Sequence, residues 1–249
     1  MTKEDDLLKK DRTIRNNVGH YETTKGFFKI SAVERDGFYD AVTGWKPGIY
    51  IQQRVRKKVL NTLDQLLDNG NVDISSAIDV GCGRGDFTIE IAKKYSQLMQ
   101  VHGCDFVKEN LTIAKRLSES MKKIDFHEAN ILDMPFNDHS FDLTVCINTL
   151  HHIHKEDLEK GLSELARITK KYLVIEIKNN NNFLYKYILP NLYKYILQNS
   201  LHGMNVYPTS IETTSRILSR YNFRLVNTSG ILLFNWLSPM VVISYEKQT

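Results

Sequence analysis

An acidic residue and three glycines occupy alternate positions in the segment Ser76–Asp86, which reads SAIDVGCGRGD. The acidic residue is Asp79, and the glycines after it are Gly81, Gly83 and Gly85. Glycine adopts backbone angles, and admits a closely approaching ligand, where a Cβ would interfere. A helix beginning at Asp86 would direct its N-terminal amides toward the same turn. The segment therefore predicts a nucleotide-type cofactor site after a buried strand.

The spacing of these glycines distinguishes between cofactors. A dinucleotide-binding turn has the pattern G-x-G-x-x-G, in which the third glycine packs the helix on the strand beneath a pyrophosphate. Here the third glycine, Gly85, comes one residue early, and the carboxylate of Asp86 would repel a pyrophosphate. A ligand with an ammonium group suits the position better, so a nicotinamide-dependent oxidoreductase is disfavoured.

The pattern from Asp79 to Gly85, D-x-G-x-G-x-G, resembles motif I of the class I S-adenosylmethionine-dependent methyltransferases. Further segments resemble the same family, in the expected order, over residues 72–178. They are an apolar strand ending in Asp105 about 20 residues after the turn, the segment 126–136 (FHEANILDMPF) and the strand 140–147 (SFDLTVCI). These motifs are most similar to those of the small-molecule methyltransferases of ubiquinone and menaquinone biosynthesis.

The resemblance implies S-adenosylmethionine as the cofactor and S-adenosylhomocysteine as its product. Asp79 would face the ammonium group, Asp105 would hold the ribose, and Asn130 would replace the family's acidic residue at the adenine edge. The implied cofactor-binding residues are Asp79, Gly81, Cys82, Gly83, Gly85, Asp105, Phe106, Asn130, Ile131 and Asn148. An alternative for Asp79 is that it only anchors the glycine turn through backbone amides.

Histidines follow the fourth predicted strand, close to where a methyl acceptor would bind. His151 and His152 are candidates for a general base, and each could instead only hydrogen-bond the surrounding loop. Tyr39 is a candidate for closing over the cofactor, with a core position as its alternative. The segment 148–151 (NTLH) lacks the prolines and aromatic ring of DNA amino-methyltransferases, so a nucleic-acid acceptor is not expected.

Composition bounds the remaining classes of protein. The chain has 249 residues, a formal net charge of +4 and three cysteines, which favours a reduced, cytoplasmic protein without a nucleic-acid partner. No Cys or His ligand spacing is present along the chain, so no metal is expected. The N-terminus lacks the apolar core of a signal peptide, and no apolar run reaches the length of about 18 residues that a membrane span needs.

Strand and helix patterns alternate along the chain, which predicts an α/β fold. We expect a Rossmann-like, doubly wound sheet of seven mostly parallel strands, whose last strand is antiparallel as the resemblance implies. Residues 1–70 would form an N-terminal arm and helical cap, and residues 71–249 the methyltransferase core. Within this core, residues 179–208 would form an aromatic, lid-like helical insertion.

The predicted insertion contains the sequence LYKYIL twice, at 184–189 and 192–197. Such a segment either packs over the core or also contacts a membrane surface through residues 183–200. Because the cap and the insertion are both aromatic and apolar, we expect a hydrophobic or aromatic methyl acceptor, such as a quinone, a polyketide or a lipid. The alternative is a methyltransferase-fold module that binds the cofactor and serves a partner or membrane surface without turnover.

Overall fold

The computed structural model describes residues 46–67, 73–183, 187, 206–231 and 237–248. The predicted N-terminal arm, with Tyr39, and most of the predicted insertion lie outside these residues. Among the helices described, none combines the length and the apolar composition that a bilayer-spanning segment requires.

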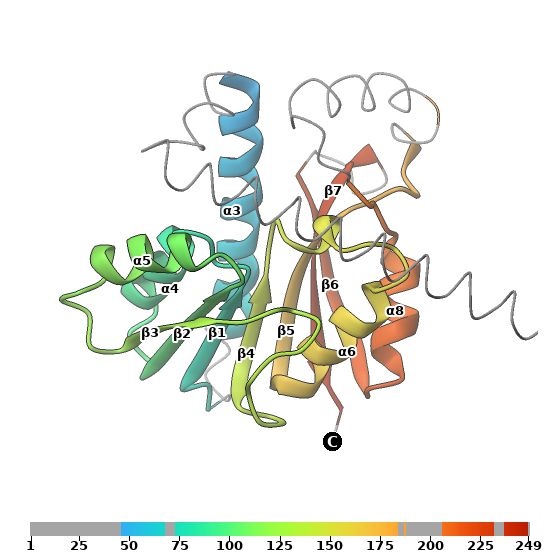
Figure 1. Ribbon diagram of the computed structural model, residues 1–249. Helices are drawn as coiled ribbons and strands as arrows, with labels where there is room; N and C mark the ends of the chain where they lie inside the picture. The colour runs from blue at the N-terminus through green and yellow to red at the C-terminus, as the bar shows by residue number, and fades with distance from the viewer. Residues whose placement is uncertain (1–45, 68–72, 184–186, 188–205, 232–236, 249) are drawn as a thin grey trace, which may run out of the picture.

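One seven-stranded sheet forms the centre of the fold (Figure 1). Its strands are β1 (Ser76–Val80), β2 (Gln100–Asp105), β3 (Ile124–Glu128), β4 (Phe141–Cys146), β5 (Thr169–Lys178), β6 (Phe223–Gly230) and β7 (Met240–Lys247). They lie in the order β3-β2-β1-β4-β5-β7-β6. The strands from β1 to β5 pair in parallel, whereas β7 is antiparallel to β5 and β6. The predicted Rossmann-like sheet with an antiparallel last strand is confirmed.

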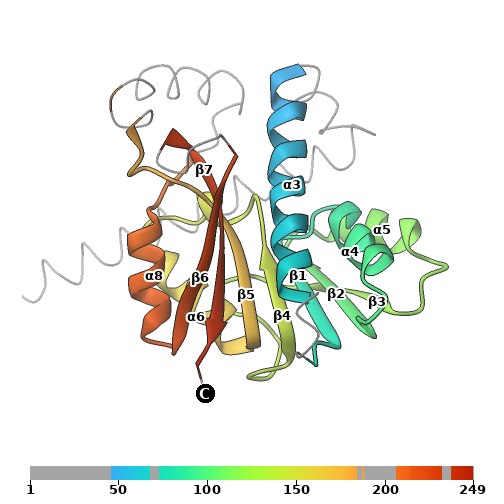
Figure 2. The same ribbon diagram turned by 180° about the vertical axis from the view of Figure 1, so that it is seen from behind.

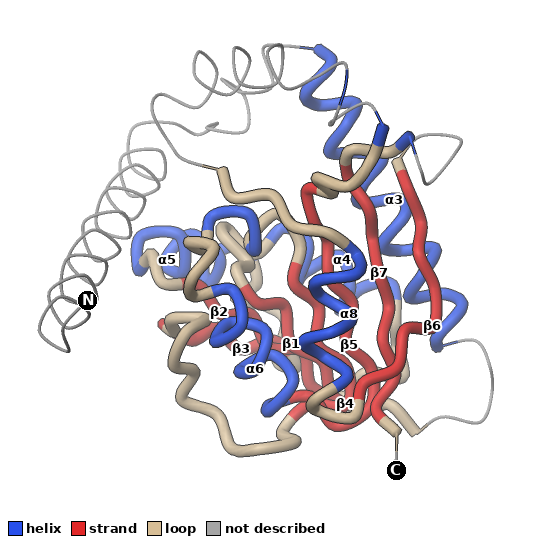
Figure 3. The backbone as a smooth tube through the Cα atoms, turned by 90° about the vertical axis from the view of Figure 1, so that its right-hand side faces the viewer, coloured by secondary structure: helices blue, strands red, loops and turns tan. Residues whose placement is uncertain are grey.

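Helices cover both faces of this sheet. They are α3 (Lys46–Leu67), α4 (Asp86–Lys94), α5 (Lys108–Leu117), α6 (Leu158–Ile168), α8 (Ile211–Ser219) and the short 3-10 helix η1 (Leu150–His152). Helices α3, α4 and α5 pack on one face, and α6 and α8 pack on the other (Figure 2). The side view in Figure 3 shows α3 and α8 on opposite sides of the strands. The sheet is therefore doubly wound, as expected.

The apolar spacing within the helices explains which face each one covers. In α3, Val55, Val59 and Leu63 recur every four residues and are fully buried against the sheet. In α6, Leu162 and Leu165 fill the equivalent position on the opposite face. Burying each of these side chains contributes about 2 kcal/mol relative to leaving it in water. The same spacing predicts a helix over residues 49–67, and α3 confirms it.

Element ends lie close to the positions that the sequence pattern predicts. All seven strands begin and end within two residues of the expected bounds, which are 76–80, 99–105, 125–128, 141–147, 171–177, 223–229 and 240–246. The sequence pattern also predicts a helix over residues 108–122, which in the structure ends at Leu117. At this end the carbonyl oxygen of Ala114 accepts both the amide of Ser118 at 3.1 Å and its hydroxyl at 3.0 Å.

The strand order reverses at β1, which pairs with β2 on one side and with β4 on the other. The chain leaving β1 enters α4 on one face of the sheet, and the chain leaving β4 enters η1 and α6 on the other face. Ligands of open α/β sheets bind in the crevice outside the carboxyl ends of the strands at such a point. The glycine turn and the histidine segment therefore flank the expected binding crevice.

Candidate functional site

The glycine turn connects β1 to α4 through left-handed backbone. Gly81, Gly83 and Gly85 have φ angles of 78°, 54° and 78°. The carbonyl oxygen of Cys104, near the end of β2, accepts the amides of Gly81 at 2.8 Å and Cys82 at 3.0 Å. A residue with a Cβ is strained in the left-handed conformation, and the turn needs this conformation at three positions. This requirement explains why glycines alternate in the sequence.

The surroundings of the three glycines differ. A Cβ on Gly81 would lie 2.1 Å from the Oγ1 atom of Thr149, and a Cβ on Gly85 would lie 2.7 Å from the ring of Phe126. A Cβ on Gly83 would meet nothing within 4 Å. Gly81 and Gly85 therefore allow the turn to pack against the protein, whereas Gly83 borders open space and is the position that a ligand can approach.

The carboxyl group of Asp79 lies beneath this turn. Its side chain is buried in β1, and the hydroxyl of Thr88 donates a hydrogen bond of 2.7 Å to its Oδ2 atom. Burial raises the pKa of Asp79 from 3.8 to about 7, with the hydrogen bond from Thr88 opposing the rise and the charge of Asp105 adding to it. Near neutral pH the carboxyl is therefore poised between its two forms, and a cation bound beside it would favour the carboxylate.

Asp105 fixes the glycine turn to the end of β2. Its Oδ2 atom accepts the amide of Gly83 at 2.9 Å, and its Oδ1 atom accepts the amide of Val107 at 2.8 Å. Burial raises the pKa of Asp105, and the two amides together with the Asn110 side chain oppose this rise. Anchoring of the turn, which the sequence left as an alternative for Asp79, is thus performed by Asp105.

The residues expected to flank adenine lie beside the end of β2. The amide of Ala129 donates to the carbonyl oxygen of Asp105 at 3.0 Å, which joins the loop after β3 to that strand. Ile131 in this loop and Phe106 after β2 are both half-buried. The Oδ1 atom of Asn130 accepts the backbone amide two residues further on at 3.0 Å, so this oxygen stabilises the loop itself. A contact of Asn130 with adenine would use its second lone pair or its NH2 group.

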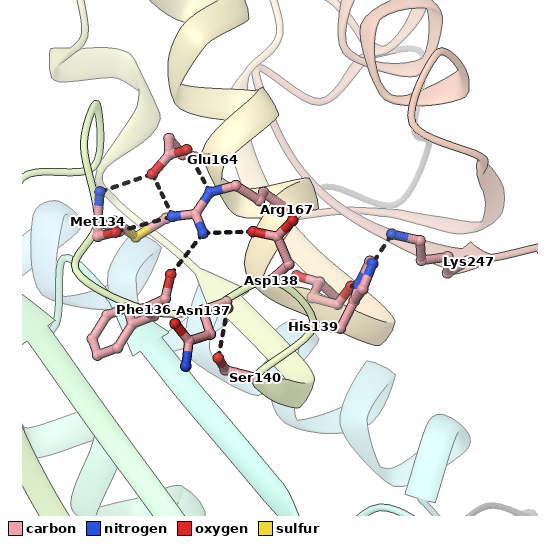
Figure 4. Close-up of polar contacts among 10 residues, drawn as sticks. Met134, Phe136, Asn137, Asp138, His139, Ser140, Glu164, Arg167 and Lys247 are labelled. Carbon is pink, nitrogen blue, oxygen red and sulfur yellow. Dashed lines mark hydrogen bonds and ion pairs between the residues drawn. The ribbon is translucent and has the colours of Figure 1, made fainter.

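Arg167 of α6 holds the far end of the same loop (Figure 4). Its guanidinium donates to the carbonyl oxygens of Phe136 at 2.6 Å and Met134 at 2.9 Å, and to the carboxylate of Asp138 at 2.9 Å. Glu164, one turn earlier on α6, accepts from Arg167 at 2.7 Å and from the amide of Met134 at 2.8 Å. The loop after β3 is therefore fixed at both ends without secondary structure of its own.

A buried ion pair lies at the carboxyl end of β5, beside the residues that follow β4. The Oε2 atom of Glu176 accepts the amide of Asn148 at 3.1 Å, and the ammonium of Lys178 lies 3.0 Å from its Oε1 atom. Glu176 is fully buried, and Asn148 has a φ angle of 53°. Glu176 and Lys178 are not among the site residues predicted from the sequence, although a glutamate inside an apolar strand (LVIEIK) is the signal that could have identified them.

His151 and His152 form η1 and lie beside this ion pair, with ring centroids 4.2 Å apart. Burial lowers the pKa of His151 well below 6.5, and the charges of His152 and Lys178 lower it further. Its ring is therefore neutral at pH 7. The Nδ1 atom of His151 is buried and has no hydrogen-bond partner among the described residues. The chain returns to this point at Tyr207, whose amide donates to the carbonyl oxygen of His151 at 2.8 Å.

The structure therefore brings together nearly all of the predicted site residues. Asp79, Asp105 and the glycine turn lie at the carboxyl ends of β1 and β2, and Asn148 with the two histidines follows β4, where Thr149 adjoins Gly81. Open space at Gly83 and two buried carboxyl groups beneath the turn suit a cofactor with a cationic end. Tyr39 lies outside the described residues.

Comparison with known proteins identifies the central part of the chain. Residues 77–172 match the family model described as "Methyltransferase domain". The demethylmenaquinone methyltransferase of Bacillus licheniformis is 34% identical over 96 residues, which are 39% of this chain and 40% of that protein. The 2-phytyl-1,4-naphtoquinone methyltransferase of Trichormus variabilis is 31% identical over 113 residues, 43% of this chain and 48% of that protein. The chain thus matches less than half the length of these curated relatives.

The fold is similar to that of a solved structure over a longer range. The magnesium protoporphyrin IX methyltransferase (ChlM) of Synechocystis PCC 6803, solved with bound SAH, superposes with a TM-score of 0.70. The match covers 92% of this chain and all of that chain, at 16% sequence identity. At this identity the likeness concerns the fold. Together, the comparisons confirm a methyltransferase domain over residues 77–172, the predicted fold, and S-adenosylmethionine as the cofactor of such a domain.

Replacing Gly83 should separate cofactor binding from folding. Because the Cβ of Gly83→Ala meets no atom within 4 Å, its cost to folding is the left-handed backbone strain, about 1–2 kcal/mol. The added methyl group narrows the space that a ligand enters. We expect a folded protein that binds S-adenosylhomocysteine about tenfold more weakly or worse, as measured by titration calorimetry and thermal melting.

Gly81→Ala is the matched control for this variant. Its Cβ would overlap Thr149, so this change should lower the melting temperature much more than Gly83→Ala does. If Gly83→Ala bound S-adenosylhomocysteine as tightly as wild type does, the prediction that the ligand binds close to Gly83 would be wrong.

Proposed function

We propose that this chain, whose residues 77–172 form a methyltransferase domain of the class I S-adenosylmethionine-dependent type, transfers a methyl group to a hydrophobic or aromatic small molecule. The observation that carries the proposal is the left-handed glycine turn above Asp79, with open space at Gly83. The acceptor class rests on the relatives, two of which are named for demethylmenaquinone and 2-phytyl-1,4-naphthoquinone. A quinone-like acceptor is accordingly the first one to test.

The chain's own residues would position the reactants for an in-line SN2 displacement. S-adenosylmethionine, when bound, supplies a methyl group already activated by the sulfonium. Asp79 would balance positive charge at the buried end of the crevice, and Asp105 would keep the glycine turn in place while facing the ribose. Alignment and exclusion of water then supply most of the rate, since proximity alone can contribute about 7–11 kcal/mol.

His151 is the group best placed to accept a proton from the acceptor. Its ring is buried and neutral, and its Nδ1 atom is not engaged by the described residues. A neutral imidazole can take a proton from an acidic hydroxyl or carbon as the methyl group is transferred. The depressed pKa of His151 limits it to an acidic acceptor, and a reduced quinone with phenolic hydroxyls meets this requirement. The ring of His152, tilted by 44° against it at 4.2 Å between centroids, would fix its orientation.

Asp79→Asn tests the electrostatic part of the proposal. Because the pKa of Asp79 in the folded protein (about 7) exceeds its ordinary value of 3.8, the folded state binds more protons than the unfolded state between these pH values. The carboxyl group therefore makes the ligand-free protein less stable as pH rises from about 4 to about 7. Asn can still accept the hydrogen bond from Thr88, so the variant should melt higher than wild type at pH 8 while binding S-adenosylmethionine more weakly.

Thermal melting at pH 5 and pH 8 and calorimetric titration with S-adenosylmethionine would measure both effects. The matched control is Asp142→Asn. Burial raises the pKa of Asp142, but hydrogen bonds from Ser75 and Ser76 outweigh it and hold that pKa below its ordinary value. Asp142→Asn should therefore destabilise the protein at pH 8 and leave cofactor affinity unchanged. A loss of stability at pH 8 in Asp79→Asn would contradict the assigned role.

Substitution of His151 tests the proton acceptor. The variant His151→Gln should retain S-adenosylhomocysteine affinity and lose about 100-fold or more in kcat, the usual share of general base catalysis. His154→Gln is the control, since His154 lies in the same segment and packs on Tyr207 at 4.8 Å between ring centroids. Full turnover of His151→Gln at every pH from 6 to 9 would exclude His151 as the base.

The acceptor class is tested with S-adenosylmethionine labelled on its methyl group. The protein is incubated with the labelled cofactor and a lipid-soluble extract or a reduced demethylnaphthoquinone, and products are partitioned between organic and aqueous phases. We expect label in the organic phase, and much less of it with Gly83→Ala at a limiting concentration of the labelled cofactor. Label that appears only in water-soluble products would refute the hydrophobic acceptor and leave the methyltransferase assignment intact.

A further inference from the structure

Two histidines and an aspartate converge at the β3 edge of the sheet, away from the glycine turn. His102 lies on β2, directly paired with Asp125 on β3, and His127 lies two residues further along β3. Side chains two residues apart on a strand point to the same face. The three side chains therefore share one face of the sheet, on the side opposite α5.

The donor atoms of these side chains are close enough to share one ion. The Nδ1 atom of His102 lies 2.9 Å from the Nε2 atom of His127, and that Nε2 atom lies 3.4 Å from the Oδ2 atom of Asp125. All three donor atoms lie within 4.8 Å of one another. Two ligands of a tetrahedral Zn²⁺, each about 2.05 Å from the metal, are about 3.3 Å apart. The carboxylate distance already has this value, and the two imidazoles need to open by a few tenths of an ångström.

Aromatic packing holds the two imidazole rings in this arrangement. His102 packs against the edge of Phe141 with ring centroids 5.2 Å apart, and His127 packs against Phe136 at 5.3 Å. The two phenylalanines in turn contact each other at 5.2 Å. Ligands whose rings are fixed by packing lose little freedom when they bind a metal, which raises affinity.

The donor atoms of the three groups suit a transition metal. His102 and His127 each offer an imidazole nitrogen, and Asp125 offers a carboxylate oxygen. Asp125 is exposed to solvent, so an ion can reach the site. Imidazole nitrogen and carboxylate oxygen together favour Zn²⁺ over Mg²⁺ or Ca²⁺, which take oxygen ligands.

We propose that His102, Asp125 and His127 form a Zn²⁺-binding site that joins the edge strand β3 to β2. Water would complete the coordination on the solvent side. No metal was expected from the sequence because short ligand spacings along the chain are absent, whereas these three ligands come from two different strands. The site is independent of the proposed methyl transfer, although β2 also carries Asp105 three residues beyond His102. A bound ion would therefore stabilise the strand on which the cofactor turn rests.

The test is calorimetric titration of ZnCl2 into chelator-treated, dialysed protein, with the d–d absorption spectrum of bound Co²⁺ as a second readout. Wild type should bind one equivalent of Zn²⁺ and give the intense visible bands of a four-coordinate Co²⁺ site. The variant His102→Ala/His127→Ala should bind about 100-fold more weakly or worse. His139→Ala, which removes an exposed histidine on the loop before β4, is the matched control and should bind as wild type does.

Asp125→Asn guards against a folding defect, because it removes an exposed ligand and leaves both rings packed on their phenylalanines. It should weaken Zn²⁺ binding while the melting temperature without metal stays that of wild type. Zn²⁺ should also raise the melting temperature of wild type and of His139→Ala but not of the double variant. The proposal is overturned if wild type binds no Zn²⁺, or if the double variant binds it with unchanged affinity and stoichiometry.

Discussion

The carbonyl oxygen of Cys104 is the point on which the cofactor side of this protein depends. It accepts two consecutive amides from the turn after β1, and the carboxylate of the next residue, Asp105, accepts a third from Gly83. Two neighbouring parallel strands are thereby joined at their carboxyl ends by three hydrogen bonds. The chain can make this connection only through left-handed backbone, which accounts for the glycines, and the same turn starts α4 at Asp86.

Fixing the turn in this way brings two carboxyl groups, Asp79 and Asp105, into a buried space. Burial and their mutual repulsion raise the pKa of Asp79 to about 7, so the charged form of Asp79 destabilises the ligand-free protein. A cationic ligand would offset this cost. Affinity for such a ligand therefore comes with lower stability of the ligand-free state. Asp142 shows the opposite case, because hydrogen bonds from Ser75 and Ser76 outweigh its burial and make its charge stabilising. Burial alone thus does not decide the role of a carboxyl group; its partners do.

Most of the fold, and the cofactor half of the site, could be predicted from the sequence because the signals are local. The apolar face of α3 repeats every four residues, and Asp79 and the glycines that form the turn are neighbours in the chain. The roles within the site were harder to assign. Sequence alone could not show that Asp105 anchors the turn, because the partner of its carboxylate, Gly83, lies 22 residues earlier. Nor could it show that the oxygen of Asn130 is already bonded within its own loop.

The acceptor half depends on contacts between residues far apart in the sequence, and this explains why it was predicted less well. Thr209 donates to the carbonyl oxygen of Lys178 at 3.0 Å, and Asn180 donates to that of Thr209 at 2.9 Å. These bonds bring the two ends of the segment 180–208 together at the carboxyl end of β5. Because Lys178 also pairs with Glu176 beside Asn148, the segment leaves and rejoins the core next to the residues that follow β4. None of these bonds involves the glycine turn, which follows β1, so the two regions are fixed to the sheet by separate contacts.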